Sequence, residues 1–488
     1  MAPAAGKPAA TDSPLPAPSA SLPVQEIVLS NGFRLLLVSR PMQATVAAGW
    51  VVETGSFDDP VGAAGMSHLL EHLLFKGSRL IGTRSFAEER PLLEREDELT
   101  AELRRLASRG SRAEKQTELR RELEQVRTQA TALARLGEFS LLYSEAGATD
   151  LNAHTFKDFA AYLVTVPAGK LEIWFWLESD RLLNPVLREF GKEAGIILEE
   201  RRQRVESVPG GAEDAAFEEH FWGDSGYAHR PLGRPAELAS IVRPEARDFF
   251  EQWFRADRLT AVLVGSFEAQ RVRELGERYF GRLPKKTTSP PSARNAAPSP
   301  RTNGPPAPWL AECACATRLR VLYPAVPFGH PDSYPLQVLS GVLNGRAGRL
   351  HRSLVIEEEI ARSARSRFQS YRHAGFFSVI AESKGGHSPE RLLAAWDAEL
   401  AGLIDKPLGE LEIGRVKSQM AANAYRSLQD PANLRTQLLV YAGLGDWQEI
   451  SRGPAHVLRV SAADVRRVAR EYLGADRRSI AYFEGTSP

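Results

Sequence analysis

The sequence predicts an α+β protein made of two similar domains, and three observations lead to this prediction. Short β-rich runs alternate with longer helical patterns along the whole chain. Residues 286–308 are rich in Pro, Ser, Ala and Gly, which is typical of a linker. The chain after this linker repeats the strand-then-helix order of its opening, which indicates two copies of one domain.

The first domain is expected over residues 24–285. It is preceded by residues 1–23, a stretch rich in Ala, Pro and Ser that predicts a disordered leader. The dipeptide Asn31-Gly32 joins two β-rich runs and predicts a hairpin. The expected strands of this domain are EIVLS and FRLLLV within residues 26–38, TVAAGWVVE (45–53) and LTAVLVGSF (259–267).

Composition and charge exclude several classes of function. The formal net charge of +1 gives no indication of a nucleic-acid partner or an anionic membrane surface. No apolar run reaches the length of a membrane span, and the leader lacks the apolar core of a signal peptide. A cytoplasmic and a periplasmic location both stay open, since Met1 could also replace a removed export signal.

The stretch GMSHLLEHLLFKG (65–77) predicts a helix with an unusual polar face. At 100° per residue its leucines share one broad side, while His68, Glu71 and His72 lie on the other. Residues four apart lie one above the other, so both histidines can direct a nitrogen at one ion, with Glu71 beside them. The alternative is a core helix that happens to contain two histidines. The H-x-x-E-H spacing favours a metal site with an adjacent base.

A charged segment follows this helix, and its leucines recur at spacings of three and four over residues 88–136. This pattern predicts a helical hairpin with narrow apolar seams and faces of Arg and Glu. A solvated antiparallel pair and a docking element are both compatible with the pattern.

The second domain is expected over residues 309–488. It opens with a strand at 318–326 and a helix at 333–345, and it contains no second H-x-x-E-H motif. Cys313 and Cys315, the two cysteines of the chain, are interpreted as unbridged strand residues, because neighbours at i and i+2 on a strand rarely form a disulfide.

A catalytic zinc site needs a third protein ligand, and the best candidate lies on a helix predicted over residues 187–207. Glu193 and Glu200 are seven residues apart and therefore share one face. Ile196 and Ile197 precede Glu200 and are expected to turn it toward the core. Glu199 is a neighbouring alternative, and a surface helix of paired Glu and Arg is the other interpretation.

At this point the sequence resembles the pitrilysin family of zinc peptidases, which includes insulin-degrading enzyme and the mitochondrial processing peptidase. The resemblance rests on GMSHLLEHLLFKGS, LSNGFRLLLV, KEAGIILEE and HRPLGRP, in this order. It implies two homologous domains, each a mostly antiparallel sheet packed against helices, together forming half of a clamshell. It also implies one Zn²⁺ per chain held by His68, His72 and Glu200, with Glu71 as general base and Glu193 in support.

The resemblance carries three further implications. Segment 88–136 is an insertion between the motif helix and the third-ligand helix. Asn152 and Ala153 match an edge strand that holds the substrate backbone in relatives. Relatives also carry an Arg and a Tyr that hold substrate near the zinc, and here Val355 and Arg362 occupy the matching positions. A heterodimer whose partner supplies this pair is therefore expected, and a homodimer is disfavoured.

The expected function is zinc-dependent hydrolysis of peptides or short unfolded polypeptides. The first alternative is a non-catalytic scaffold or assembly subunit of the same family. The intact set of His68, Glu71, His72 and Glu200 argues against a scaffold, which needs no base beside a metal. The second alternative is a structural zinc site, but no fourth protein ligand is found.

Overall fold

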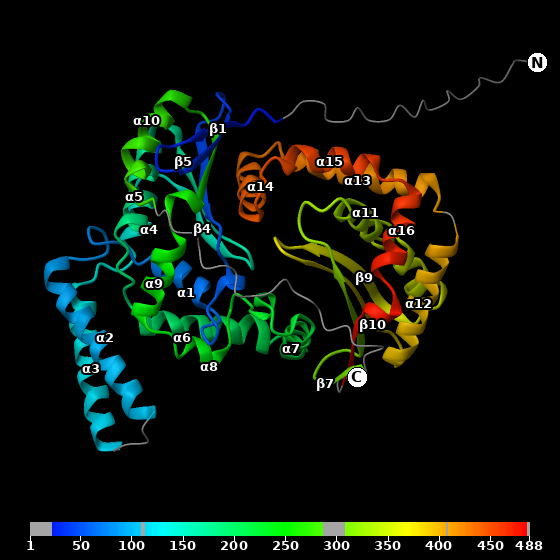
Figure 1. The fold of residues 1–488 in the computed structure, drawn as a ribbon, viewed down its shortest axis with the longest axis horizontal. Helices are drawn as coiled ribbons and strands as arrows, with labels where there is room; N and C mark the ends of the chain where they lie inside the picture. The colour runs from blue at the N-terminus through cyan, green and yellow to red at the C-terminus, as the bar shows by residue number, and fades with distance from the viewer. Residues whose placement is uncertain (1–21, 109–112, 286–307, 407, 486–488) are drawn as a thin grey trace, which may run out of the picture.

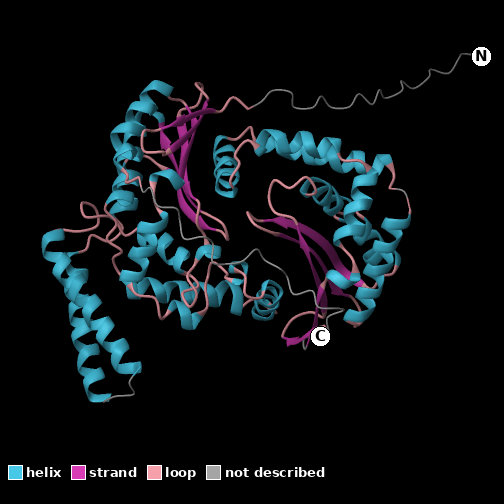
Figure 2. Ribbon diagram, viewed as in Figure 1, coloured by secondary structure: helices cyan, strands magenta, loops and turns pink. Residues whose placement is uncertain are grey.

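A computed structural model describes residues 22–108, 113–285, 308–406 and 408–485 as two β-sheets surrounded by helices (Figures 1 and 2). Residues 1–21 of the predicted leader and residues 286–307 of the predicted linker lie outside these ranges. The expectation of an α+β fold built from two similar halves is confirmed.

The first sheet has the strand order β1-β2-β6-β3-β5-β4. Its neighbouring strands are antiparallel except for the parallel pair β2 and β6. β4 therefore lies at one edge of the sheet. The strands are β1 (Gln25–Val28), β2 (Arg34–Ser39), β3 (Thr45–Val52), β4 (Thr149–Thr155), β5 (Ala160–Pro167) and β6 (Leu259–Gly265).

Helices of the same half cover one face of this sheet. Side chains of β3 and β5 form a core there with residues of α1, α4, α5, α9 and α10. The helices of this half are α1 (Met66–Leu74), α2 (Phe86–Ser108), α3 (Ala113–Leu133), α4 (Glu138–Glu145), α5 (Leu171–Leu183), α6 (Phe190–Arg201), α7 (Gly211–Trp222), α8 (Pro235–Leu238), α9 (Arg243–Trp253) and α10 (Ala269–Tyr279).

The second sheet has the strand order β7-β11-β8-β10-β9, and β9 forms one of its edges. Its strands are β7 (Trp309–Cys313), β8 (Arg318–Ala325), β9 (Ala361–Ser370), β10 (Gly375–Ser383) and β11 (Ser479–Gly485). One face packs against helices that follow in the chain. The helices of this half are α11 (Ser333–Leu343), α12 (Pro389–Asp405), α13 (Glu410–Ser427), α14 (Pro431–Leu444), α15 (Glu449–Arg459) and α16 (Ala462–Tyr472), and all of them except α14 contribute to this core.

The other face of each sheet is covered by one helix from the opposite half. Leu434, Leu438 and Leu439 of α14 are fully buried against the first sheet. Phe217 and Phe221 of α7 are buried against the second sheet in the same way. Figure 1 shows α14 beside the first sheet and α7 beside the second. Each half therefore completes the core of the other.

The charged segment after the motif helix forms an antiparallel pair, α2 and α3, that projects from the first half (Figure 1). Its leucine seam is a small core of its own, made by Leu99, Leu119, Leu123 and Val126. Two buried arginines hold its base. Arg188 binds Glu89 at 2.6 Å, and Arg243 forms ion pairs with Glu96 and Asp97.

The predicted helix 187–207 begins later than expected. Leu187 and Glu189 both have a φ of 54°, so regular helix starts only at Phe190. The cause is Arg188 between them, which donates to the carbonyls of Lys76, Ser78 and Ile81 and fixes the chain in this turn. The helix ends at Arg201 and continues as a π-helical turn, Arg202–Glu206.

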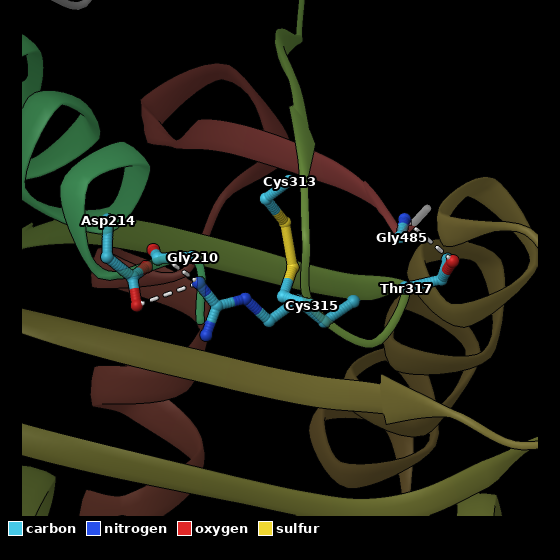
Figure 3. The surroundings of a disulfide bond; sticks show 7 residues. Gly210, Asp214, Cys313, Cys315, Thr317 and Gly485 are labelled. Carbon is cyan, nitrogen blue, oxygen red and sulfur yellow. Dashed lines mark hydrogen bonds and ion pairs between the residues drawn. A yellow bond between two sulfur atoms is a disulfide. The ribbon is translucent and has the colours of Figure 1, made fainter. Parts of the chain in front are cut away.

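The interpretation of the two cysteines as unbridged strand residues was wrong, because Cys313 and Cys315 form a disulfide (Figure 3). β7 ends at Cys313 and the chain bends, so the two residues do not share a strand. Their Cα atoms are 5.2 Å apart, within the range that a disulfide spans. The bridge lies beside Gly210, at the start of α7.

Candidate metal centre

The motif helix α1 is buried along almost its whole length. Its leucines lie in the core of the first half, and His68 and Glu71 are only 7% and 8% exposed. Gly65 starts the helix with a φ of 101°, which a residue with a Cβ rarely adopts. The carboxylate of Asp59 then caps the first turn, because it accepts hydrogen bonds from the backbone N–H of Gly65 at 2.7 Å and of Ser67 at 2.9 Å. Cap and core together fix the polar face of the helix.

His68, His72 and Glu200 come together although Glu200 belongs to a different helix, α6. The Nε2 atoms of both histidines face Glu200 Oε2, at 3.8 Å from His68 and 3.6 Å from His72. One ligand atom from each of the three residues lies within 4.8 Å of the others. The two rings stand nearly perpendicular, at 87° with centroids 4.8 Å apart.

These separations suit a metal better than hydrogen bonds. A hydrogen bond between imidazole and carboxylate spans about 2.7–3.2 Å, so contacts of 3.6 and 3.8 Å are too long. Atoms about 2.1 Å from a tetrahedral zinc lie about 3.4 Å from one another, close to the observed values. Burial, His72 and Arg204 lower the pKa of His68 to about 3, so its ring is neutral at pH 7. Two imidazoles and one carboxylate are a donor set that fits Zn²⁺.

A second carboxylate orients His72 from the other side. Glu193 Oε2 lies 3.2 Å from His72 Nδ1, so that nitrogen donates its proton and leaves Nε2 free to bind a metal. Lys76 binds Glu193 Oε1 at 2.6 Å and also reaches Glu189. Burial opposes ionisation of Glu193, but the hydrogen bonds from His72 and Lys76 outweigh it and lower its pKa. His68 lacks such support, because its buried Nδ1 has no hydrogen-bond partner among the described residues.

Glu71 lies beside this cluster and outside it. Its carboxylate accepts a hydrogen bond from the hydroxyl of Thr155, the last residue of β4. Burial raises the pKa of Glu71, and the hydrogen bond from Thr155 opposes that rise. The centre therefore has three convergent donors and a separate buried carboxylate that is held by a hydroxyl.

Asn152 and Ala153 lie on β4, the edge strand next to this centre. Ala153 is buried and Asn152 is exposed. The backbone N–H of Ala153 donates a hydrogen bond to the side-chain oxygen of Asn152 at 2.8 Å. This N–H therefore points away from the sheet, where an added strand would pair.

The structure separates the glutamates that the sequence left as alternatives. Glu199 is exposed and pairs with Arg202, while Glu200 turns inward. The other carboxylate oxygen of Glu200, Oε1, binds Arg204 at 2.7 Å. The expectation that both isoleucines face the core was wrong, because Ile197 is fully buried but Ile196 is 40% exposed. The two residues are 100° apart on the helix, so only one of them faces inward with Glu193.

Sequence reasoning missed Thr155, Lys76 and Arg204. Lys76 and Arg204 stand four residues from His72 and Glu200, so a search at helical spacing could have found them. Thr155 is 84 residues from Glu71, and no local pattern connects the two.

Val355 and Arg362, which the resemblance aligns with an Arg and a Tyr of relatives, lie in the second half. Val355 packs against the second core, and Arg362 on β9 pairs with Glu382 at 3.6 Å. These contacts belong to the second half itself.

Fold and site together define the class: a two-domain α+β protein with a His-His-Glu cluster beside an edge strand. Two sequence families match the chain, "Insulinase (Peptidase family M16)" over residues 34–90 and "Peptidase M16 inactive domain" over residues 240–420. Both matches support the assignment of the chain to the pitrilysin-like M16 peptidase family.

Relatives of known name agree with this assignment at low identity. "Zinc protease PqqE" of Helicobacter pylori is 22% identical over 92% of this chain and 90% of its own length. "Mitochondrial-processing peptidase subunit beta" of Lentinula edodes is also 22% identical, over 92% and 88%. Among solved structures, a protease from Helicobacter pylori superposes with a TM-score of 0.78 at 19% identity, covering 95% of this chain and 99% of its own. Pitrilysin gives 0.71 at 15% identity, and this chain spans 46% of its length.

In the described part of the chain, none of the helices has the length and apolar character needed to cross a bilayer.

Proposed function

We propose that this chain is a zinc-dependent endopeptidase that hydrolyses peptides or short unfolded polypeptides. One observation carries the proposal: His68, His72 and Glu200 converge at metal-ligand distances while Glu71 stands beside them, buried and uncoordinated. A zinc ion held by the three donors supplies a Lewis acid that polarises a peptide carbonyl and lowers the pKa of the attacking water.

The side chains around this centre have distinct roles in the proposal. Glu71 accepts the proton of the attacking water and returns it to the leaving amine. Glu193 keeps the Nε2 lone pair of His72 directed at the metal. The exposed edge of β4 at Asn152 and Ala153 pairs with the backbone of an extended peptide, so that the scissile bond lies across the centre.

The proposal includes a partner subunit. The Arg and Tyr that hold substrate in relatives are replaced here by Val355 and Arg362, so a homologous chain that carries the pair would complete the site. The relatives named as beta subunits of the mitochondrial-processing peptidase support this assembly. A non-catalytic assembly subunit is the second candidate, favoured by the match of residues 240–420 to the inactive-domain family.

Four forms of the purified chain test the catalytic proposal. The wild-type chain, with the partner if one co-purifies, is expected to bind one zinc and cleave an unfolded peptide. Glu71→Gln is expected to keep the zinc and lose activity by about 10³-fold, because general-base catalysis contributes about 10²–10⁴-fold. Metal content by mass spectrometry and peptide cleavage by chromatography are the two measurements.

Adjacent glutamates provide a matched pair of variants for the metal. Glu200→Gln is expected to lose zinc, while Glu199→Gln is expected to retain both zinc and activity because its side chain faces solvent. An active Glu71→Gln protein contradicts the catalytic role. A zinc-loaded wild type that stays inactive with its partner supports the assembly subunit instead.

A further inference from the structure

Thr155 is the one described residue whose side chain forms a hydrogen bond with the Glu71 carboxylate. It is the last residue of β4 and pairs with Ala160 of β5, so two elements fix its backbone. Alternate side chains of β4 face the same way, and Leu151 and Ala153 pack in the core toward α1. The same alternation turns the Thr155 hydroxyl toward α1.

A single fixed donor has a clear consequence for a buried carboxylate. Glu71 has three rotatable side-chain bonds, and packing in the core restricts the first of them. The Thr155 hydroxyl holds Oε2, which leaves Oε1 free to exchange a proton. Because Thr is branched at Cβ, its own χ1 is restricted, and the donor is in place before substrate arrives.

The strand that provides this donor is also the strand that offers its edge to a peptide. Thr155 lies two residues from Ala153, whose N–H points outward. A peptide backbone paired with β4 therefore lies against the strand whose end carries the hydroxyl. The helix α1 packs on β4, so the edge, the hydroxyl and Glu71 form one contiguous unit.

We infer that Thr155 is a positioning residue that holds Glu71 in its reactive orientation and ties that orientation to the substrate-binding edge strand. The inference rests on the proposed peptidase function. It assigns Thr155 no contact with the reacting atoms, so the loss of its hydroxyl slows turnover without weakening metal or substrate binding.

Thr155→Val removes the hydroxyl at nearly constant volume, and Thr155→Ser keeps it. Thr155→Val is expected to lower kcat by about 10- to 100-fold with KM within about 3-fold, as for an interaction made in the transition state. Thr155→Ser is expected to stay within about 3-fold of wild-type kcat. Zinc content and thermal midpoint are measured for each variant to exclude a lost metal or a misfolded chain.

Thr128→Val, at an exposed position of α3 and outside β4, is the matched control and is expected to behave as wild type. In a Glu71→Gln background, Thr155→Val is expected to leave the residual rate unchanged. A general structural effect of the substitution would lower that rate further. An inactive wild-type chain refutes the proposed function. An active wild type with equal kcat for Thr155→Val refutes only this inference.

Discussion

The two halves of the molecule share one strand plan. The first sheet contains the order β2-β6-β3-β5-β4. Its last strand in the chain, β6, lies between β2 and β3, parallel to β2 and antiparallel to β3. In the second sheet, with the order β7-β11-β8-β10-β9, the last strand β11 likewise lies between β7 and β8, parallel to β7 and antiparallel to β8. In both halves an α-helix follows the central strand of this plan, α1 after β3 in the first half and α11 after β8 in the second.

The same helix-to-edge contact occurs in both halves with different chemistry. In the first half Glu71 of α1 accepts from Thr155 on the edge strand β4. In the second half Ser340 of α11 contacts Ser366 on the edge strand β9, and both groups are neutral. The contact is thus part of the fold, and the titratable residues are an addition to it. This difference shows how one architecture carries a set of candidate metal ligands in one copy and none of them in the other.

The halves also depend on each other, because each sheet is closed by a helix of the other half. Leu438→Ala in α14 and Phe217→Ala in α7 each remove a fully buried side chain at these junctions. We expect each to lower the free energy of unfolding by about 2–5 kcal/mol. Urea unfolding followed by circular dichroism and by tryptophan fluorescence measures the loss.

Because each half contributes a helix to the core of the other, we expect the two halves to unfold together. Either variant is expected to shift both probes together, because the cavity weakens both halves. Leu411→Ala, at a side chain 89% exposed, is the control and should change stability by less than about 0.5 kcal/mol. Separate transitions for the two halves in the wild type would show that α7 and α14 do not couple them.

The sequence predicted the elements of this comparison better than their packing. The hairpin at Asn31-Gly32, the motif helix and the repeated opening of the second half follow from turn chemistry and periodicity, which are local. The exchange of α7 and α14 does not, because each helix packs on strands from the far side of the linker. The Cys313–Cys315 disulfide was missed because the end of β7 could not be located to one residue.

The residues of the candidate site also differ in whether the sequence could predict them. His68, Glu71 and His72 follow from spacing on one helix, so the sequence identified them as a group. The choice between Glu199 and Glu200 depended on which of two adjacent residues faces α1, and spacing alone left it open. Only the paired helices place Glu200 Oε2 at 3.6 Å from His72.

The two edge strands differ in how their outer backbone groups are satisfied. On β9, Asn344 at the end of α11 binds both the N–H and the C=O of Ser366, each at 2.8 Å. On β4 the N–H of Ala153 donates a hydrogen bond to the side chain of its neighbour Asn152, and a rotation of that side chain breaks this bond. β9 is therefore closed to strand addition at its centre, while β4 stays available.

Asn344→Ala is expected to reopen the β9 edge. The loss of two hydrogen bonds should cost about 1–2 kcal/mol in urea unfolding. The exposed edge should also give concentration-dependent self-association, measured by sedimentation velocity. Asn433→Ala, at an exposed position of α14, is the matched control. A monomeric Asn344→Ala protein of wild-type stability would show that this amide does not protect the edge.

The aspartates that precede the two corresponding helices differ in the direction of their pKa shifts. Burial raises the pKa of Asp59, before α1, to about 7 despite its hydrogen bonds from Ser67 and Gly65. The pKa of Asp332, before α11, is lowered from 3.8 because Arg467 and Tyr472 donate to its carboxylate and outweigh its burial. A carboxylate with a lowered pKa stabilises the fold above the unfolded value, and this contribution is lost as the pH falls through the folded value.

Asp332→Asn should therefore destabilise the chain at pH 7 and progressively less below pH 4, where the wild-type carboxylate also becomes protonated. Because Arg467 is about half exposed, the difference should stay below about 1 kcal/mol. Urea unfolding of both proteins from pH 3 to pH 7 measures it. In an Arg467→Ala background the same substitution should lose most of this pH dependence, because the cation that lowers the pKa is gone. A difference that is constant across the range, or that grows toward acid, would show that the ion pair with Arg467 does not set the charge of Asp332.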